Sequence, residues 1–256
     1  MNLPLIRPDW PAPTAVRAVC TIRDGGISTG PYRSLNLADH VGDDPASVAA
    51  NRARLVAALD LAEEPLWLHQ VHGATIVRAD AIERPSGPPT ADAAIAFGRA
   101  RPCVVLTADC LPVLFCDRAG RAVAAAHAGW RGLAAGVLQS TVAGMGVPPQ
   151  DLLAWLGPAI SATAFEVGPE VREAFLAADP AFAPAFAPNA RGRWQADLYA
   201  LARIALRAAG VSAIHGGGYC THGQTDAFFS YRRDGQTGRM AAMIWLTPHD
   251  GRAGPA

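Results

Sequence analysis

The fold of this chain is decided by the stretch Thr107-Ala-Asp-Cys-Leu-Pro-Val-Leu-Phe-Cys-Asp-Arg-Ala-Gly-Arg-Ala-Val-Ala-Ala-Ala-His-Ala-Gly-Trp-Arg-Gly132. Two apolar runs in it are joined by Asp-Arg-Ala-Gly, a four-residue segment typical of a β-hairpin loop. If Cys116 pairs with Arg121 across this loop, Cys110 lies opposite His127 on the same face of the sheet. A one-residue change of register would place the thiol and the imidazole on opposite faces. The stretch therefore predicts an antiparallel hairpin that brings these two groups together.

The flanking sequence contains more strands than helices. Strand-like runs rich in β-branched and aromatic residues cover residues 66–68, 75–78, 103–107, 113–116, 122–126, 152–156, 227–231 and 240–246. Several are joined by turns too short for a helical crossover, so antiparallel pairing must be common. We expect an α+β layered fold with mixed, largely antiparallel sheets, forming a single domain over residues 1–256 with loose ends at about 1–14 and 248–256.

Helices are predicted at four places. Asp44-Pro45 is a typical helix start, because a capping carboxylate precedes a Pro in the first turn. Further helices are expected over residues 169–178 and 197–209, the second ended by Gly210. Another helix is expected to run from Gly129 through Thr141.

The composition excludes several classes of function. The chain has 256 residues, with 22 positive and 22 negative side chains, and every cation is Arg. A neutral chain without a basic run is not expected to bind nucleic acid, and without Lys no Schiff base can form. No apolar run can span a bilayer and no signal peptide is evident, so we expect a cytoplasmic protein without a membrane partner. The five Cys are spread widely without a CxxC pair, which favours reduced thiols.

The chemically interesting side chains also have ordinary structural explanations. Cys110 could pack as a small hydrophobe, as free Cys commonly does. Its predicted His partner, followed by Gly-Trp-Arg-Gly at a helix start, instead favours a site where backbone N–H groups and Arg131 face an anion. Arg131 could equally be a surface cation. His69 and His72 resemble ordinary loop histidines, and neither HExxH nor a Cys-pair zinc spacing is present.

Motifs in order along nearly the whole chain resemble a known family. They are Ser34-Leu-Asn-Leu-Ala-Asp-His-Val-Gly-Asp-Asp44, Gln70-Val-His-Gly73, Ala108-Asp-Cys-Leu-Pro112, His127-Ala-Gly-Trp-Arg-Gly132, Leu156-Gly-Pro158, Phe165-Glu-Val-Gly168, Phe228-Phe-Ser-Tyr-Arg-Arg233 and Thr237-Gly-Arg-Met-Ala241. With these motifs the chain closely resembles the YfiH-type family, whose members have been called laccase-domain or polyphenol oxidase proteins.

The resemblance implies an α/β/β/α layered domain and a single zinc ion held by His72, Cys110 and His127. It also implies phosphorolysis of adenosine, inosine, guanosine and methylthioadenosine, together with deamination of adenosine. The expected substrates are thus purine nucleosides and phosphate, and Arg131 is the candidate for holding the phosphate. Three protein ligands leave a fourth zinc position open, which is the arrangement of catalytic sites. His69 receives no role.

Nearby residues have roles that the sequence leaves open. Asp109 is a candidate proton carrier or partner of a ligating His, and a structural role is equally compatible with its position. Phe228, Phe229 and Tyr231 could stack on a purine, although aromatic residues at strand spacing are commonly core.

Three other readings use the same His₂Cys set. Seven His without a His-x-His pair argue against a four-copper oxidase, whereas a single copper at this site is possible. A metal-free hydrolase could use Cys110 as nucleophile and His127 as base, for example on an amide of a cell-wall precursor. A structural or metal-storage site is the non-catalytic alternative.

Overall fold

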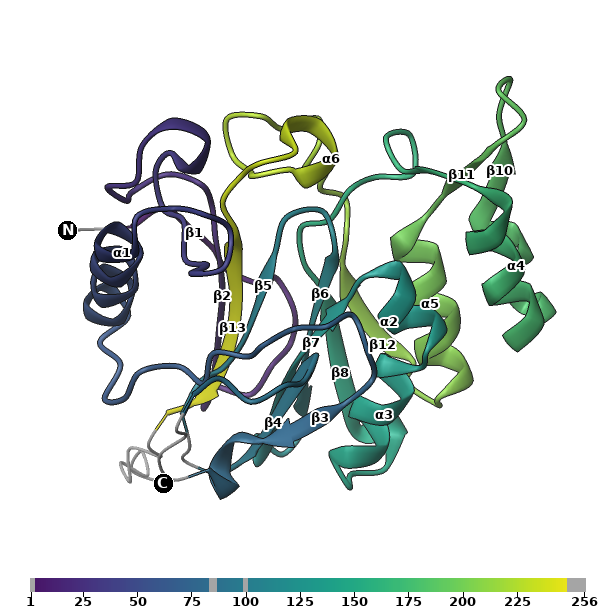
Figure 1. Ribbon diagram of the computed structural model, residues 1–256. Coiled ribbons are helices and arrows are strands. Elements are labelled where there is room, and N and C mark those ends of the chain that lie inside the picture. Colours follow the sequence, from purple (N-terminus) through teal and green to yellow (C-terminus); the bar gives the residue numbers. More distant parts are fainter. Residues whose placement is uncertain (1–2, 83–86, 99–100, 248–256) are drawn as a thin grey trace.

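Two β-sheets packed face to face form the centre of the computed structural model, which describes residues 3–82, 87–98 and 101–247 (Figure 1). The larger sheet has the order β12-β8-β6-β7-β4-β3 and the smaller one the order β1-β2-β13-β5. Within the larger sheet only β3 with β4 and β12 with β8 are parallel. The predicted α+β fold with largely antiparallel sheets is confirmed.

The larger sheet is buried on both faces, as its nearly continuous apolar sequence requires. Its strands are β3 (Ile76–Arg78), β4 (Ala93–Phe97), β6 (Leu111–Asp117), β7 (Ala122–Ala128), β8 (Leu152–Leu156) and β12 (Ala213–Gly216). Side chains alternate along β6: Phe115 faces a helical layer, whereas Leu114 and Cys116 face the other sheet. Ala-rich β7 lets both neighbouring layers approach closely.

The smaller sheet covers the inner face of the larger one. It consists of β1 (Leu5–Ile6), β2 (Val16–Thr21), β5 (Cys103–Thr107) and β13 (Met240–Leu246). Cys103, Val105 and Ile244 pack against Leu114 and the rest of the inner face of the larger sheet. On the other face Val104 and Met243 pack against Leu55 of the helix α1 (Pro45–Ala58).

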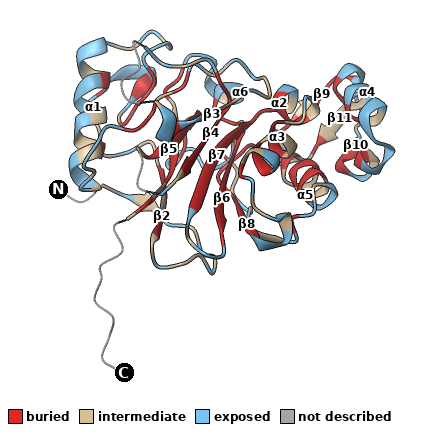
Figure 2. Ribbon diagram, turned by 90° about the horizontal axis from the view of Figure 1, so that it is seen from below, coloured by how far each residue is buried: buried red, intermediate tan, exposed pale blue. Residues whose placement is uncertain are grey.

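Helices cover both outer faces, which gives four layers in the order α/β/β/α. The side opposite α1 carries α2 (Trp130–Ala134), α3 (Val137–Gly144), α4 (Pro169–Ala178) and α5 (Leu198–Ala208). Figure 2 shows buried strands between helices whose outer surfaces are exposed. A small sheet of β9 (Glu166–Val167), β11 (Trp194–Ala196) and β10 (Phe186–Pro188) lies beside α4. The remaining elements are α6 (Tyr231–Asp234) and the 3₁₀ turns Gly30–Tyr32, Ala79–Ala81, Pro149–Asp151 and Pro180–Ala185.

The helix predictions hold at three places and fail at one. Asp44 caps α1 by accepting hydrogen bonds from Ser47 N and Ala46 N, and α4 and α5 lie where expected. The helix predicted from Gly129 through Thr141 is instead divided between α2 and α3. Gly136 separates them with φ of 86°, a left-handed conformation that ends a helix.

The hairpin between β6 and β7 forms, but its register differs from the predicted one. Cys116 pairs with Val123, not with Arg121. The predicted pairing is wrong because Asp117 still belongs to the strand, so the loop lies one residue later, over residues 118–121. The Asp117 carboxylate closes this loop by accepting hydrogen bonds from Arg121 N at 2.6 Å and Ala122 N at 2.9 Å.

This change of register preserves the face on which the two site residues lie. The shift is by two positions, and side chains alternate with a period of two. His127 therefore lies directly opposite Pro112. Cys110, two residues before Pro112, becomes a diagonal neighbour of His127 on the same face.

Two predicted strands are absent from the described part of the chain. Residues 66–68 contribute only an isolated bridge from Leu66 to Cys103. Residues 227–231 form a loop that leads into α6, where Ser230 caps the helix. At the ends, β1 pairs with β2, and residues 248–256 lie outside the described part. Among the described residues no helix combines the length and apolarity needed to cross a membrane.

Candidate metal centre

Three side chains meet where β6 begins and β7 ends, beside the loop that carries His72. The ligand atoms of His72, Cys110 and His127 all lie within 4.8 Å of one another. Cys110 Sγ lies 3.7 Å from His72 Nε2, and the two imidazole rings have centroids 4.7 Å apart. His127 is buried, Cys110 is half-buried and His72 is exposed. The group is therefore anchored in the protein on one side and open to solvent on the other.

Asp92 holds two of these three residues in place. Its carboxylate accepts a hydrogen bond from His127 Nδ1 at 2.8 Å and three from the backbone N–H groups of Val71, His72 and Gly73, at 3.2, 2.9 and 2.7 Å. These donors stabilise the charge of a completely buried carboxylate and hold His72 at φ of 61°. Asp92 was not predicted from the sequence, where its only signal is an acidic residue directly before the apolar run of β4.

The electrostatics of the site favour an ionised Cys and His pair when no metal is bound. Burial by itself raises the pKa of the Cys110 thiol, but the charge of His127 and hydrogen bonds from His127 and His72 outweigh it and lower the pKa to about 6. Burial lowers the pKa of His127, whereas the Cys110 thiolate and Asp92 outweigh it and raise the pKa to about 9. By contrast, burial raises the pKa of Cys116 to about 12.

Gly129 has no side chain, and the space that a side chain would need there is occupied by Cys110 and His72. A Cβ atom at this position would lie 2.9 Å from Cys110 Sγ and 2.9 Å from His72 Cδ2. The backbone of Gly129 is extended and would accept any residue, with φ of −67°. The requirement for Gly is therefore imposed by the site, not by backbone conformation.

Asp109 connects Cys110 to the C-terminal loop. Its buried carboxylate accepts hydrogen bonds from Thr221 Oγ1 at 2.6 Å, Ser230 Oγ at 3.0 Å and Arg232 N at 2.6 Å. These bonds hold α6 beside the strand end that carries Cys110. Of the roles left open for Asp109, the structural one is thus the one that its contacts support.

The remaining candidate residues, Arg131 and the aromatic residues before and in α6, differ in their exposure to solvent. Arg131 is exposed and its guanidinium stacks on the Trp130 ring at 4.4 Å. It belongs to α2, a helix of five residues, so the long helix expected at this anion site is absent. Phe228 and Phe229 are buried core residues and cannot stack on a ligand, whereas Tyr231 is 61% exposed.

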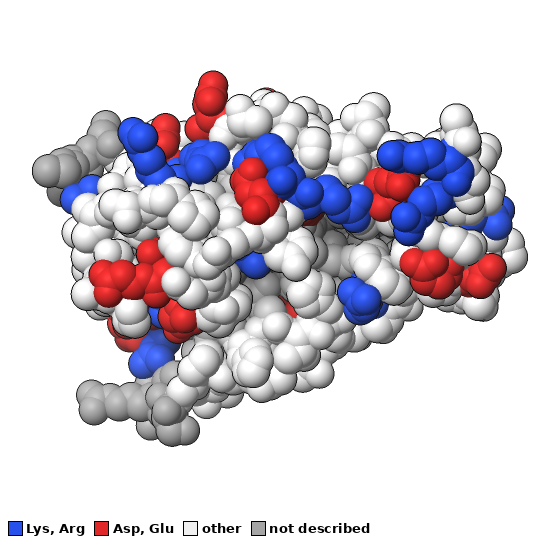
Figure 3. Space-filling view, turned by 45° about the horizontal axis from the view of Figure 1, so that its top comes forward, with Lys and Arg blue, Asp and Glu red and all other residues white. Residues whose placement is uncertain are grey.

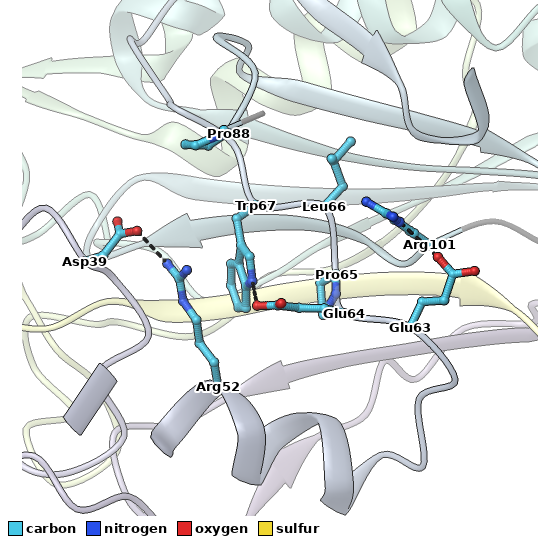
Figure 4. Close-up of a pocket in the computed structure, with 10 residues that line it drawn as sticks. Asp39, Arg52, Glu63, Glu64, Pro65, Leu66, Trp67, Pro88 and Arg101 are labelled. Atoms are coloured by element: carbon cyan, nitrogen blue, oxygen red, sulfur yellow. Dashed lines mark hydrogen bonds and ion pairs between the residues drawn. The ribbon is translucent and has the colours of Figure 1, made fainter. Parts of the chain in front are cut away.

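A larger cavity lies elsewhere on the described part of the chain and shows no comparable chemistry. It measures about 770 Å³ and includes Arg52, Trp67 and Arg101 in its lining (Figure 4). Arg52 pairs with Asp39, the Trp67 ring nitrogen donates to Glu64, and Arg101 pairs with Glu63. Figure 4 shows these contacts along the walls of the cavity. They are surface interactions between ordinary charged groups, so the His₂Cys group remains the better candidate site.

The His₂Cys group fits a zinc ion. Tetrahedral zinc with Zn–N near 2.0 Å and Zn–S near 2.3 Å requires N and S ligand atoms about 3.6 Å apart. The observed 3.7 Å between Cys110 Sγ and His72 Nε2 agrees with this spacing. The bond from His127 Nδ1 to Asp92 leaves Nε2 of His127 for the metal, as in the carboxylate–histidine pairs common around bound zinc.

Comparison with known proteins extends the likeness to almost the whole chain. The family described as multi-copper polyphenol oxidoreductase laccase matches residues 17–247. The purine nucleoside phosphorylase PA4543 of Pseudomonas aeruginosa is 56% identical over 242 residues, covering 94% of this chain and 98% of that protein. The purine nucleoside phosphorylase YfiH of Escherichia coli is 52% identical with the same coverage.

Solved structures show the same fold. NMB0706 from Neisseria meningitidis has a TM-score of 0.90 and 53% identity, over 94% of this chain and 98% of that chain. YlmD from Geobacillus stearothermophilus has a TM-score of 0.88 and 32% identity, over 94% and 96%. The motifs, the four-layer fold and these likenesses agree, and the chain belongs to the YfiH-type, or laccase-domain, family.

Proposed function

We propose that this protein is a zinc-dependent purine nucleoside phosphorylase that also deaminates adenosine. The observation that carries the proposal is the convergence of His72, Cys110 and His127, a donor set for zinc that faces solvent on one side. The names of its relatives support the substrate class. The proposed substrates are adenosine, inosine, guanosine and methylthioadenosine, with phosphate as the second reactant.

The protein side chains have distinct tasks in this proposal. His72, Cys110 and His127 would hold the metal, and Asp92 keeps His127 in the tautomer that leaves its Nε2 unprotonated. A zinc ion at this site would supply Lewis-acid chemistry. Tyr231, the exposed aromatic residue of α6, would lie against the base, and Arg131 is a candidate contact for phosphate.

The two proposed reactions are distinguished by their products. In phosphorolysis a phosphate oxygen forms a bond to C1′ of the ribose while the C1′–N9 bond breaks, and the base leaves with its electron pair and gains a proton. Ribose 1-phosphate and the free base result. In deamination water replaces the amino group at C6 of adenosine, giving inosine and ammonia.

Copper is the alternative metal, because the family description names copper and a His₂Cys set also suits this ion. The described residues contain one such group of His, Cys and acidic side chains, whereas a multicopper oxidase needs several copper ions. A single zinc ion at this site is therefore the proposal.

The experiment measures turnover as a function of the bound metal. Metal-free protein, and the same protein reloaded with zinc or with copper, would be incubated with inosine and phosphate, and hypoxanthine and ribose 1-phosphate would be quantified. Adenosine without phosphate would test for inosine and ammonia. We expect both activities with zinc, and we expect Cys110→Ala to abolish them. Cys116→Ala is the matched control: Cys116 is packed between the two sheets, away from the proposed ligands, so this variant should retain activity.

Three results would contradict the proposal. Full turnover in verified metal-free protein would favour the Cys–His hydrolase, particularly if Cys110 is alkylated rapidly in the native protein. Oxidation of phenols by copper-loaded protein without any nucleoside turnover would favour an oxidase. Bound zinc with no turnover of any nucleoside would favour a structural or storage site.

A further inference from the structure

Arg239 is half-buried, and the described residues provide no acidic partner for its guanidinium in an ion pair. Its Nη1 donates to the carbonyl oxygens of Thr237 at 2.8 Å and Gly238 at 3.0 Å. No hydrogen bond to another described residue is found from Nε or Nη2. Because a guanidinium has five N–H donors in a planar fork, this leaves one edge available to a ligand.

The position of Arg239 is fixed by its backbone. Its N–H donates to Asn36 Oδ1 at 3.0 Å, and its carbonyl accepts from Leu37 N at 3.4 Å. Asn36 is completely buried and also binds Asp43 and the Ala38 carbonyl. The guanidinium is therefore presented from a rigid part of the core, unlike that of Arg131.

A chain of contacts connects Arg239 through α6 to the strand end that carries Cys110. Asp109, the residue before Cys110, binds Arg232 N and Ser230 Oγ and so fixes the start of α6. The ring of Tyr231, between them in sequence, lies 5.8 Å from the guanidinium carbon of Arg239. Burial lowers the pKa of Arg239, and the charges of Cys110 and Asp109 raise it, so these groups are within electrostatic reach of one another.

No described carboxylate neutralises Arg239 through an ion pair. Asp109, on the strand end that carries Cys110, already accepts three hydrogen bonds from other groups. A half-buried guanidinium without an anion is unfavourable, so the site favours a negatively charged ligand. A second polar group next to Arg239 is also unsatisfied: Thr237, whose carbonyl accepts from Arg239, has a buried Oγ1 without a hydrogen-bond partner among the described residues.

We propose that Arg239 binds the phosphate group of a ligand at the metal centre, with its free N–H edge on two phosphate oxygens. The proposal rests on the proposed function, and it assigns phosphate binding to the Arg of the Thr237–Ala241 motif, to which the sequence alone gave no role. Bidentate Arg–phosphate contacts are strong and directional. Figure 3 shows a row of basic side chains, with some acidic ones among them, beside a hollow in the face of the molecule that it displays. The phosphate could be free inorganic phosphate or that of a nucleoside monophosphate.

The test compares phosphate binding in Arg239→Gln, Arg239→Lys and the wild type, all loaded with zinc. Phosphate affinity would be measured directly by ³¹P NMR line broadening and calorimetry, and the phosphate KM from inosine phosphorolysis. Adenosine 5′-monophosphate in place of phosphate distinguishes the two sources. Arg17→Gln is the matched control. The Arg17 side chain donates to the Thr14 carbonyl, and in the β2–β13 pairing Arg17 lies opposite Trp245, at the other end of β13 from Met240, which follows Arg239.

We expect Arg239→Gln to weaken phosphate binding about 10- to 100-fold, the loss expected for charged hydrogen bonds. Arg239→Lys, which retains the charge without the fork, should lose less, and methylguanidinium should restore binding to Arg239→Gln. Inosine affinity and zinc content should be unchanged. If the variants bind phosphate as the wild type does, or if only Arg131→Gln impairs it, the inference is wrong. If the wild type binds phosphate through Arg239 but turns over no nucleoside, the proposed function fails and the inference stands.

If Arg239→Gln does not fold, Arg239→Lys decides the question, because its ammonium can still donate to the carbonyls of Thr237 and Gly238. A folded Arg239→Lys protein with unchanged phosphate affinity and KM would overturn the inference. Tighter binding of adenosine 5′-monophosphate than of inorganic phosphate, lost in both variants, would assign the contact to a nucleotide.

Discussion

Replacing Gly129 with Ala adds one methyl group between two of the proposed zinc ligands. The new Cβ would lie 2.9 Å from Cys110 Sγ and from His72 Cδ2. Optimal contacts between such atoms are about 3.5–4.0 Å, so each side chain must retreat by roughly 0.6 Å or more. Metal sites tolerate about 0.2 Å in ligand distance. Two of the three ligands would therefore be displaced beyond what zinc coordination allows.

The expected effect is a large loss of zinc affinity with a small loss of stability. Removing an outer-shell partner typically costs 10- to 100-fold in metal affinity, and displacing two ligands should cost at least about as much. Gly129 caps α2, and Ala is a poorer cap by about 1 kcal/mol. That corresponds to a decrease in Tm of about 2–4 °C in a protein of this size.

The assay is zinc competition against a chromophoric chelator, together with thermal unfolding of the metal-free protein. Gly223→Ala is the matched control, because its Cβ would lie 3.6 Å from Cys220 Sγ, an ordinary contact. We expect the control to bind zinc as the wild type does. Normal zinc affinity in Gly129→Ala would refute the geometric reasoning, as would an equal loss in Gly223→Ala. Collapse of the metal-free fold would show that Gly129 serves packing instead.

Three further outcomes follow from the same geometry. Asp92→Asn should lower zinc affinity about 10- to 100-fold, measured by the same competition, because His127 loses its carboxylate acceptor; unchanged affinity would remove Asp92 from this role. In metal-free protein, iodoacetamide should alkylate Cys110 faster as pH rises through about 6, since the reactive thiolate forms above its lowered pKa, and a midpoint near 9 would contradict the assigned electrostatics. Purified protein should contain about one zinc per chain, lost in Cys110→Ala and retained in Cys116→Ala; elemental analysis showing equal loss in both would indicate misfolding.

The sequence was sufficient where the determining interactions are local. Asp44 followed by Pro45 predicts the start of α1, because a cap and a fixed φ act within one turn. The strands over residues 103–107, 152–156 and 240–246 were predicted with the observed bounds, since β-branched and apolar runs identify a strand buried on both faces. Side-chain alternation likewise placed Cys110 and His127 on one face, despite the error in register.

Tertiary contacts decided what local patterns could not. Phe228 and Phe229 look like a strand, yet Asp109, more than a hundred positions earlier, binds Ser230 and fixes this segment as a loop and short helix. The aromatic rings fill the core instead. A carboxylate that accepts hydrogen bonds from distant residues leaves no periodic signal in the sequence around either partner.

The candidate site shows the same division. Motifs identified the three proposed ligands, because their residue types and surroundings are distinctive in the sequence itself. The contacts of Asp92 and Arg239 are visible only in the folded chain. Asp92 accepts hydrogen bonds from backbone N–H groups of a turn about twenty residues earlier. Arg239 lies against the Tyr231 ring of α6. The sequence determined which groups the protein can use for chemistry, whereas packing of the two sheets and their loops decided which of those groups are held together, because burial and hydrogen bonding depend on contacts between distant segments.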